Sequence, residues 1–397
     1  MKSFSLRATL VALVVCAPVA EAAAVTITVT HGLDAARPGT VVSVPFAQIA
    51  AIDPALRMFH VVVRDSRGRS LPLQITNYQH DHRGAQYDDL VFSYDFAAGE
   101  KRAVFTLEPV ATATAPEAPC VYARFVPERL DDVAWENDRI AFRIYGQGLW
   151  KVDSLLSSGL DVWVKRVRTP IVEKWYAKGH DEYHRDTGEG ADFFDVGQTL
   201  GAGGTAIWRD GKMYRAWNFK SWKVIANGPV RAIFELQYQP WDAGSGPRVT
   251  ETKRIALDAG QNLNHVTSIF RSESPVNDLP WVTGLVKRPS VVGSESKARP
   301  WAWLSVWGPV VPKDGGHGDL GTAVLIPRDA VSEWRENDDH YFLVSHTRPG
   351  EPVNYWVGAG WTDSGDFRDV REWWTYLDQF AQRLSTPIKT FLETQSP

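Results

Sequence analysis

The chain has 397 residues, of which 44% are hydrophobic, 23% charged and 12% aromatic, a balance that excludes an intrinsically disordered or fibrous protein. Its 43 basic and 47 acidic side chains give a formal charge of −4, and no long basic run interrupts the sequence. Neither nucleic acid nor an anionic membrane surface is therefore expected as a partner.

Residues 1–22 have the pattern of a secretory signal peptide. Lys2 and Arg7 form a charged start, Leu10 to Val15 an apolar stretch, and Ala20-Glu21-Ala22 a cleavage site of small residues. No later stretch approaches the roughly 20 apolar residues that a membrane-spanning helix requires. We therefore expect a periplasmic or secreted protein that loses its signal peptide and has no membrane span.

Tryptophan usage marks a boundary between two domains. All 17 tryptophans fall at or after Trp135, and a run of small residues and prolines, Ala111 to Pro119, precedes them. We predict an immunoglobulin-like β-sandwich over residues 23–118 and a larger catalytic domain over residues 119–397. The mature chain keeps one cysteine, Cys120, so we expect neither an intramolecular disulfide nor a cysteine-based metal site.

Alternating apolar residues predict strands throughout the smaller domain. Val25, Ile27 and Val29 lie on one face of the first strand. Further strands are predicted over Met58 to Arg64, Leu71 to Thr76, Leu90 to Phe96 and Ala103 to Leu107. The short turns within each successive pair predict two β-hairpins.

The larger domain is also mostly strand and ends in a helix. Alternate residues are apolar from Arg231 to Tyr238, which indicates a strand with one buried and one wet face. Similar strands are predicted over Ile140 to Tyr145, Thr250 to Leu257 and Leu263 to Phe270. Near the end, apolar residues recur every three or four positions from Val370 to Leu384, which predicts one helix that packs on a sheet. The expected fold class is therefore all-β.

The excess of tryptophan suits a sheet face that binds sugars. Sugars present apolar C–H faces for stacking and hydroxyl edges for hydrogen bonds. The alternative, which we favour for any single tryptophan, is that the indole rings fill a wide sandwich.

The densest group of ionisable side chains lies over residues 174–192. Its candidate functional residues are Lys174, Trp175, His180, Tyr183, His184, Asp186, Glu189 and Asp192. Three glycines, Gly179, Gly188 and Gly190, predict a loop rather than a helix. A solvated polar loop is the alternative, but the histidine and tyrosine content favours a functional site.

The spacing of His180 and His184 raises the question of a metal. Zinc proteases carry two histidines four residues apart on a helix, but Asp181 replaces their glutamate and the glycines argue against a helix here. Carboxylates such as Asp186 and Asp192 would suit calcium, and the histidines zinc or manganese. We expect no cofactor, with a divalent cation as the alternative.

A second polar stretch covers residues 127–146. In its predicted strand Arg139, Arg143 and Tyr145 face away from the core. Arginine on a sheet face can bind a carboxylate through two parallel hydrogen bonds, as uronic acids require. An ordinary ion pair with Glu136 or a neighbouring acid is an equal alternative.

Five motifs together resemble a bacterial domain family of unassigned name that occurs among genes for uronate-polysaccharide degradation. They are Trp135-Glu-Asn-Asp-Arg139, Tyr183-His184-x-Asp186-Thr-Gly-Glu-Gly-x-Asp192, Val196-Gly-x-Thr-Leu-Gly-Ala-Gly-Gly204, Asn227-Gly-Pro-Val-Arg231 and Trp374-x-Tyr-Leu377. The resemblance spans essentially the whole mature chain. It implies a galactose-mutarotase-like β-supersandwich for the larger domain. The family includes an oligosaccharide dehydratase that acts on ulvan fragments, so the resemblance also implies an oligosaccharide substrate.

The chemistry expected from these residues is β-elimination at a uronic-acid residue, by a dehydratase or a lyase. The reaction needs a cation for the carboxylate, a base for the C5 proton and an acid for the leaving oxygen. Arg143 and Arg231 are the candidate cations, with Lys174 or Lys220 as substitutes. Tyr183 and His184 are the candidate base and acid, in either order.

Other residues complete the predicted site. Lys174 and His180 are further catalytic candidates, and the predicted substrate-binding residues are Arg143, Arg231, Glu136, Asn137, Asp186, Glu189, Asp192 and Trp175. A sugar mutarotase or epimerase and a non-catalytic carbohydrate-binding protein are the alternative functions. The saccharide, the linkage and the oligomeric state stay open.

Overall fold

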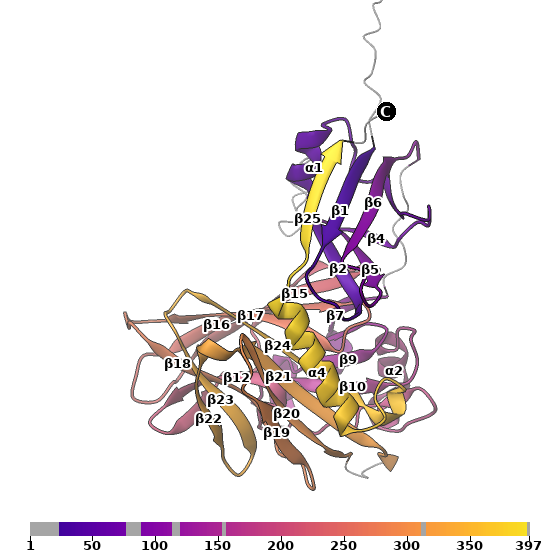
Figure 1. Ribbon diagram of the computed structural model, residues 1–397. Helices are drawn as coiled ribbons and strands as arrows, with labels where there is room; N and C mark the ends of the chain where they lie inside the picture. The colour runs from indigo at the N-terminus through magenta and orange to yellow at the C-terminus, as the bar shows by residue number, and fades with distance from the viewer. Residues whose placement is uncertain (1–23, 77–88, 113–119, 153–155, 311–314, 395–397) are drawn as a thin grey trace, which may run out of the picture.

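The computed structural model describes residues 24–76, 89–112, 120–152, 156–310 and 315–394, and antiparallel β-sheet dominates it (Figure 1). The prediction of an all-β protein is confirmed. The predicted signal peptide, residues 1–22, lies outside the described residues. No helix in the described ranges is both long and apolar enough to cross a membrane.

The smaller sandwich consists of two sheets that stand above the larger domain in Figure 1. One sheet has the order β25 (Lys389–Thr394), β1 (Val25–Thr30), β6 (Arg102–Pro109) and β3 (Val61–Asp65), and the other has the order β2 (Arg37–Pro45), β5 (Asp89–Phe96) and β4 (Leu73–Thr76). Val25, Ile27 and Val29 are fully buried between the sheets, as their alternation predicted. A short helix, α1 (Phe46–Ile52), follows β2.

The first predicted hairpin pairs only beside its turn, at Arg64 opposite Ser70, and the second does not form. β3 pairs with β6 while β4 pairs with β5, so the turn after Asp65 carries the chain from one sheet to the other. β5 and β6 likewise belong to opposite sheets. A tight turn brings two strand ends together, but burial of an apolar face on each strand decides whether they pair in one sheet or face each other across the core.

The last strand of the chain belongs to the smaller sandwich. β25 pairs along its whole length with β1, from Val25 opposite Thr394 to Thr30 opposite Lys389. The predicted domain boundary assigned all of residues 119–397 to the larger domain, and it therefore misses this strand. β25 covers the edge of β1 that would otherwise expose unpaired backbone groups.

Three sheets build the larger domain. The first has the order β11 (Gly190–Ala191), β10 (Asp161–Lys165), β9 (Ile140–Ile144), β8 (Asp132–Glu136) and β7 (Tyr122–Val126). The second has the order β13 (Lys212–Arg215), β12 (Ala202–Arg209), β18 (Leu279–Val286), β23 (His340–Thr347) and β22 (Val331–Glu336). The third has the order β14 (Ser221–Ala226), β15 (Arg231–Trp241), β16 (Val249–Asp258), β17 (Leu263–Ser272), β24 (Pro352–Trp361), β21 (Asp319–Pro327), β20 (Trp301–Pro309) and β19 (Val292–Ser296).

One apolar core joins these sheets. It includes Phe142 and Val162 from the first sheet, Ile207 from the second, and Phe234 and Ile255 from the eight-stranded sheet. Trp135 lies fully buried in it against Phe142 and Phe234. This tryptophan fills the sandwich, in keeping with the interpretation that we favoured for single tryptophans.

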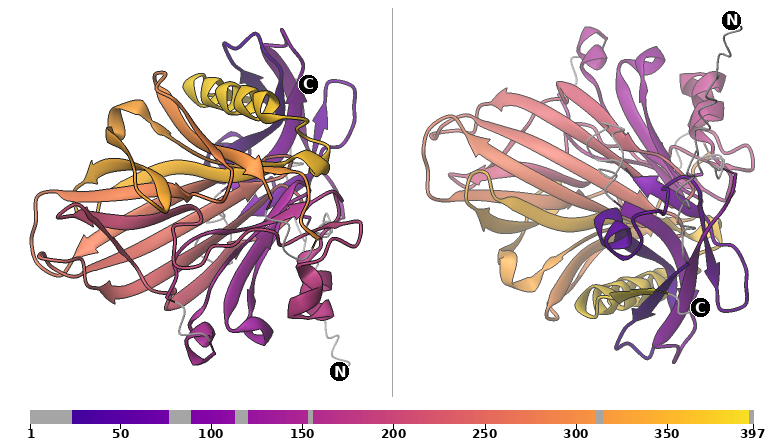
Figure 2. Two further views of the ribbon diagram at one scale, coloured as in Figure 1. Left: turned by 90° about the horizontal axis from the view of Figure 1, so that it is seen from below. Right: turned by 90° about the horizontal axis from the view of Figure 1, so that it is seen from above.

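The predicted C-terminal helix is present as α4 (Val370–Ser385) on the outer face of the eight-stranded sheet (Figure 2). Asp369 caps it, since its side chain accepts hydrogen bonds from the backbone N–H groups of Arg371 and Glu372. Trp373 is fully buried and donates a hydrogen bond to Ser305 on β20.

The region predicted as a glycine-rich loop contains two short helices, α2 (Val172–Lys178) and α3 (His180–Tyr183). Gly179 separates them with a φ of 95°, a left-handed value that glycine adopts without strain. The Glu136 carboxylate accepts hydrogen bonds from the N–H groups of Ile171 and Val172 at the start of α2. The loop prediction was wrong because this carboxylate, which lies on a distant strand, satisfies the orphan donors of α2.

Candidate functional site

A buried charged network lies beneath α2 and α3. Arg143 on β9 is 3% exposed and donates hydrogen bonds to Asp161 at 2.8 and 2.5 Å, to Asp192 at 2.7 Å and to the Tyr183 hydroxyl at 3.0 Å. Arg143 faces away from the main core, as predicted, but α2 and α3 cover that face. The same prediction for Tyr145 is wrong, because its ring is buried within the main core. Arg143 is therefore a buried ion-pair centre rather than a surface cation.

The carboxylates of this network outnumber its buried guanidinium. Burial raises the pKa of Asp161 and raises the pKa of Asp192 well above its usual range. Burial also raises the pKa of Asp132 to about 6, and its Oδ2 has no hydrogen-bond partner among the described residues. The network therefore retains protons that exposed carboxylates would have released.

His184 follows α3 and borders this network. Its Nδ1 lies 2.9 Å from the backbone carbonyl oxygen of Asp192, and its side chain is 26% exposed. A carbonyl oxygen only accepts, so Nδ1 carries the proton and Nε2 carries the lone pair. Burial, assisted by the charges of Arg143 and His180, lowers the pKa of His184. His184 is thus a neutral imidazole that can accept a proton at Nε2.

Tyr183 lies under His184 rather than beside it. Its ring is 2% exposed and stacks on Trp163 at 4.9 Å, and its hydroxyl accepts hydrogen bonds from Arg143 and, at 3.1 Å, from Arg129. The ring centroid of Tyr183 is 4.7 Å from that of His184. The tyrosine therefore joins His184 to two guanidinium groups.

Arg129 is a candidate that the sequence analysis did not single out. It ends the short 3-10 helix η2 (Pro127–Arg129) and is half-buried. Within the described ranges, no carboxylate lies within 4.0 Å of its guanidinium. Its positive charge is therefore available to an anionic ligand.

A second histidine, His317, faces the same loop from the far end of the sequence. Its Nδ1 lies 2.6 Å from Asp363 Oδ2, and its Nε2 lies 2.9 Å from Asp186 Oδ2. Arg166 forms an ion pair with Asp186, and its Nη2 is 3.2 Å from His317 Nε2. His317 Nε2 thus has an acceptor nearby when it is protonated and a donor nearby when it is not, which suits a group that transfers protons.

The loop that follows α3 contacts both histidines. Phe193, the residue after the Asp192 carbonyl that holds His184, lies 5.7 Å from the ring of His317. Asp186 is two residues from His184, and its carboxylate holds His317. Hydrogen bonds from the Gly190 and Gly188 N–H groups and from His317 lower the Asp186 pKa against the opposing effect of burial. A glycine on each side of His317 was the signal that could have drawn attention to it.

The remaining predicted residues of this segment form a neighbouring group. Lys174 is exposed and lies 2.6 Å from Glu189, which also accepts a hydrogen bond from the Trp175 indole at 3.3 Å. Trp175 is 2% exposed and stacks on Trp163. His180 is exposed, and its ring centroid is 4.9 Å from that of His184. These contacts place Lys174 and Glu189 in a surface ion pair beside α2.

Glu136 and Asn137 are fully buried and hold the scaffold together. Glu136 caps α2 and forms an ion pair with Lys165 at 2.6 Å. Asn137 donates hydrogen bonds to the carbonyl oxygens of Asp258 and Gln261. The Asn137 side chain also accepts hydrogen bonds from the N–H groups of Arg139 and Ile140.

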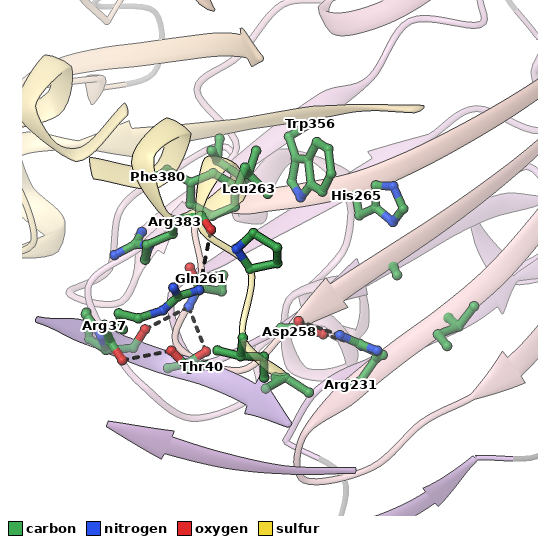
Figure 3. Close-up of a pocket in the computed structure, with 18 of the residues that line it drawn as sticks. Arg37, Thr40, Arg231, Asp258, Gln261, Leu263, His265, Trp356, Phe380 and Arg383 are labelled. Carbon is green, nitrogen blue, oxygen red and sulfur yellow. Dashed lines mark hydrogen bonds and ion pairs between the residues drawn. The ribbon is translucent and has the colours of Figure 1, made fainter. Parts of the chain in front are cut away.

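Arg231 lies elsewhere, in a pocket between the two sandwiches (Figure 3). It forms a bidentate ion pair with Asp258 at 2.5 and 2.8 Å. Its ion-pair partner Asp258 and its backbone partner Gln74 lie outside the Arg143 network. The expected convergence of Arg143 and Arg231 on one site is not observed, because they occupy different sheets.

We find no candidate metal site among the described residues. None of their histidine, cysteine, aspartate or glutamate side chains gather in a group of three or more that could hold an ion.

Sequence comparison identifies relatives of this chain. A family described as "Domain of unknown function (DUF4861)" matches residues 29–390. "Uncharacterized protein P7" of Formosa agariphila is 33% identical over 288 residues, which cover 68% of this chain and 70% of that protein.

Solved structures show weaker likeness. An α-mannosidase from Enterococcus faecalis V583 has a TM-score of 0.49 at 10% identity over 94% of this chain. A protein of glycosyl hydrolase family 38 from Enterococcus faecalis has a TM-score of 0.48 at 11% identity over 95% of this chain. The chain spans 46% and 48% of those longer chains.

Proposed function

We propose that this chain, which belongs to the DUF4861 family, catalyses β-elimination at a uronic-acid residue of an oligosaccharide, with His184 as the base. The observation that carries the proposal is the hydrogen bond from His184 Nδ1 to the Asp192 carbonyl. It leaves a lone pair on a half-buried Nε2 of lowered pKa, which is the state that a general base needs at neutral pH.

The proposed reaction is balanced without a cofactor. His184 Nε2 takes the C5 proton, and the C5–H electron pair forms the C4=C5 double bond. The C4–O bond breaks, and the leaving oxygen takes a proton to become water or the hydroxyl of a departing sugar. The C5 proton is acidic only because the neighbouring carboxylate is stabilised as charge develops on it.

Arg129 supplies that stabilisation in the proposed mechanism. It is preferred over Arg143 because the buried Asp161 carboxylate already pairs with Arg143 through two hydrogen bonds. Tyr183 holds Arg129 through its hydroxyl and is a positioning residue, since it is buried.

His317 is the proposed acid for the leaving oxygen. Its side chain is 41% exposed, and Asp186 and Asp363 hold its two nitrogens. Arg166 stays beside Nε2 after the proton has left and can donate to it. The base and the acid thus come from segments on two sides of one loop.

Two features support a uronate substrate. One is the resemblance of the chain's motifs to a family found with uronate-polysaccharide degradation. The other is the presence of both Arg129 and the neutral His184. Arg129 has no acidic partner within 4.0 Å in the described residues, and elimination needs a cation and a base together.

The test is an assay of the purified protein on a panel of uronate oligosaccharides. Ultraviolet absorbance reports the new C4=C5 double bond, and mass spectrometry separates water loss from chain cleavage. We expect unsaturated product from the wild type and a roughly 10²–10⁴-fold lower rate from His184→Asn. His346→Asn is the matched control, because His346 also contacts an aspartate, Asp278, at 2.8 Å but lies on β23.

Three outcomes would decide the matter. Water loss from an intact chain identifies a dehydratase, and cleavage identifies a lyase. No unsaturated product across the panel, or full activity in His184→Asn, would overturn the proposal.

A further inference from the structure

A cavity of about 490 Å³ lies where the smaller sandwich meets the outer face of the eight-stranded sheet and the end of α4 (Figure 3). Its volume is within the range of small-molecule sites. The sheet contributes Arg231, His265 and Trp356, α4 contributes Arg383, and β2 contributes Arg37. Both sandwiches therefore form its wall.

The cavity is rich in positive charge. Of its four arginines, Arg231 pairs with Asp258, and Arg254 pairs with Glu235 at 2.7 Å. Arg37 and Arg383 have no carboxylate within 4.0 Å in the described part of the chain. The wall thus carries two guanidinium charges that these acids do not balance.

Arg37 is held in place by backbone carbonyl oxygens, and part of its guanidinium makes no hydrogen bond in the described structure. It is 5% exposed, and it donates hydrogen bonds to the carbonyl oxygens of Thr386 at 2.5 Å and Arg383 at 3.4 Å. Its Nε is buried and has no hydrogen-bond partner among the described residues. Figure 3 shows the ion pair of Arg231 and Asp258 on the opposite side of the pocket.

Arg383 adds a second buried donor without a partner. Its Nη2 is buried and makes no hydrogen bond in the described structure. The guanidinium lies 5.2 Å from the ring centroid of Phe380 and 5.7 Å from that of Tyr376. Burial lowers the pKa of both arginines, and the charge of Arg383 lowers that of Arg37 further. A buried cation beside a half-buried one, without a counter-charge, is costly, and a bound anion would offset that cost.

The other side of the cavity is aromatic. The rings of His265 and Trp356 stack with centroids 4.4 Å apart, and Leu263 and Phe380 line the same cavity. Burial lowers the pKa of His265, so its ring is neutral and presents a flat surface. A sugar can place an apolar face on such a surface while its anionic group approaches the arginines.

From this combination we infer that the cavity is a binding site for an anionic sugar residue, one that carries a carboxylate or a sulfate. Arg37 and Arg383 bind the oxyanion, and the wall of His265 and Trp356 contacts the sugar ring. The site is separate from the His184 loop and stands whether or not the chain catalyses elimination.

The experiment is isothermal titration calorimetry of the full mature chain with D-glucuronate, D-glucose 6-sulfate, D-glucose and sodium sulfate. We expect at least one anionic sugar to bind, with D-glucose and sodium sulfate each at least tenfold weaker. Raising the salt concentration should weaken the binding, because the contact is electrostatic. The tighter of the two anionic sugars identifies the carboxylate or the sulfate as the preferred group.

Variants tie the binding to the residues. Arg383→Gln and Arg37→Gln should each weaken it at least tenfold, and His184→Asn should leave it unchanged. Arg371→Gln is the matched control, because it removes an exposed arginine from the same helix. If Arg37→Gln fails to fold, Arg383→Gln is the decisive variant. The Arg383 side chain donates no hydrogen bond in the described structure, so this substitution removes none.

Several results would overturn the inference. They are no binding by either anionic sugar, equal binding by D-glucose or by sulfate alone, and binding that persists in folded Arg383→Gln. Loss of binding in His184→Asn would instead place the ligand at the loop.

Discussion

His184 lies where burial and a backbone carbonyl act on the same imidazole. Because burial lowers its pKa from 6.5, the neutral form that accepts a proton already dominates at neutral pH. We predict that kcat/KM on a uronate oligosaccharide rises with pH through a midpoint below 6.5. A midpoint above 6.5 in the measured pH profile would contradict the assignment of His184 as base.

His180 provides a finer test of the same base. Its charge is one of the causes that lower the His184 pKa, after burial and Arg143. We predict that His180→Asn moves the acidic limb of the kcat/KM profile to higher pH while the plateau rate changes less than twofold. Collapse of the plateau would show instead that His180 takes part in the chemistry, as the sequence analysis expected.

Asp132 links the buried network to stability. Its folded pKa of about 6 lies above the ordinary 3.8, so the folded state holds this proton more tightly than the unfolded state does. Ionisation of Asp132 therefore lowers the free energy of unfolding little below pH 4. The loss grows as the pH rises to 6, and it keeps its full size at higher pH. At about 1.4 kcal/mol per pKa unit, the full cost is roughly 3 kcal/mol.

We predict that Asp132→Asn removes this part of the pH dependence. Urea denaturation at pH 4.5 and pH 7.5 should show that the variant loses less free energy of unfolding between the two values than the wild type loses. Asp329→Asn, which alters an exposed carboxylate, is the control and should match the wild type. An equal loss in Asp132→Asn and the wild type would show that Asp132 is ionised in the fold.

At the scale of elements, β25 is a strand whose partner lies at the other end of the chain. Leu392 lies opposite Ile27 and packs on the core of the smaller sandwich, while Phe391 is 51% exposed. We predict that Leu392→Asp lowers the free energy of unfolding by about 1–3 kcal/mol, because it buries a charge. Phe391→Asp should change it by less than about 0.5 kcal/mol in the same urea titration. Equal effects would mean that β25 contributes no buried face.

Periodicity predicted elements better than it predicted their partners. The strand from Arg231 and the helix from Val370 follow from spacings of two and of three to four residues, which depend on local side-chain geometry. The helix α2 was missed because Glu136, 36 residues before Val172, satisfies its first N–H groups. The hairpin pairings failed because either sheet could bury an apolar strand face.

At the scale of the whole molecule, side chains from the smaller sandwich bind backbone groups of the larger domain. Gln74 accepts hydrogen bonds from the N–H groups of Val230 and Arg231 and donates one to the Arg231 carbonyl. Gln261 reaches in the other direction and donates to the carbonyl oxygens of Pro38 and Gly39. These contacts tie the two sandwiches together beside the arginine-lined pocket.

We therefore predict that the wild type unfolds in one cooperative calorimetric transition. Gln74→Ala should leave two N–H groups of the larger domain unsatisfied and lower the stability of the junction by about 2–4 kcal/mol, so that two transitions appear. Gln237→Ala, which changes an exposed glutamine on β15, is the control and should keep one. A single transition with an unchanged midpoint in Gln74→Ala would show that the junction contributes little.

The amino-acid sequence by itself determined the all-β class, the strands with clear alternation, the C-terminal helix, and the grouping of Tyr183, His184 and Asp192 in one segment, since alternation and composition are local properties. Only the tertiary structure decided that Arg143 is buried, that Arg231 lines another pocket, and that Arg129 and His317 join the loop. Charge compensation and burial depend on which distant strands meet, and no spacing within the chain records that.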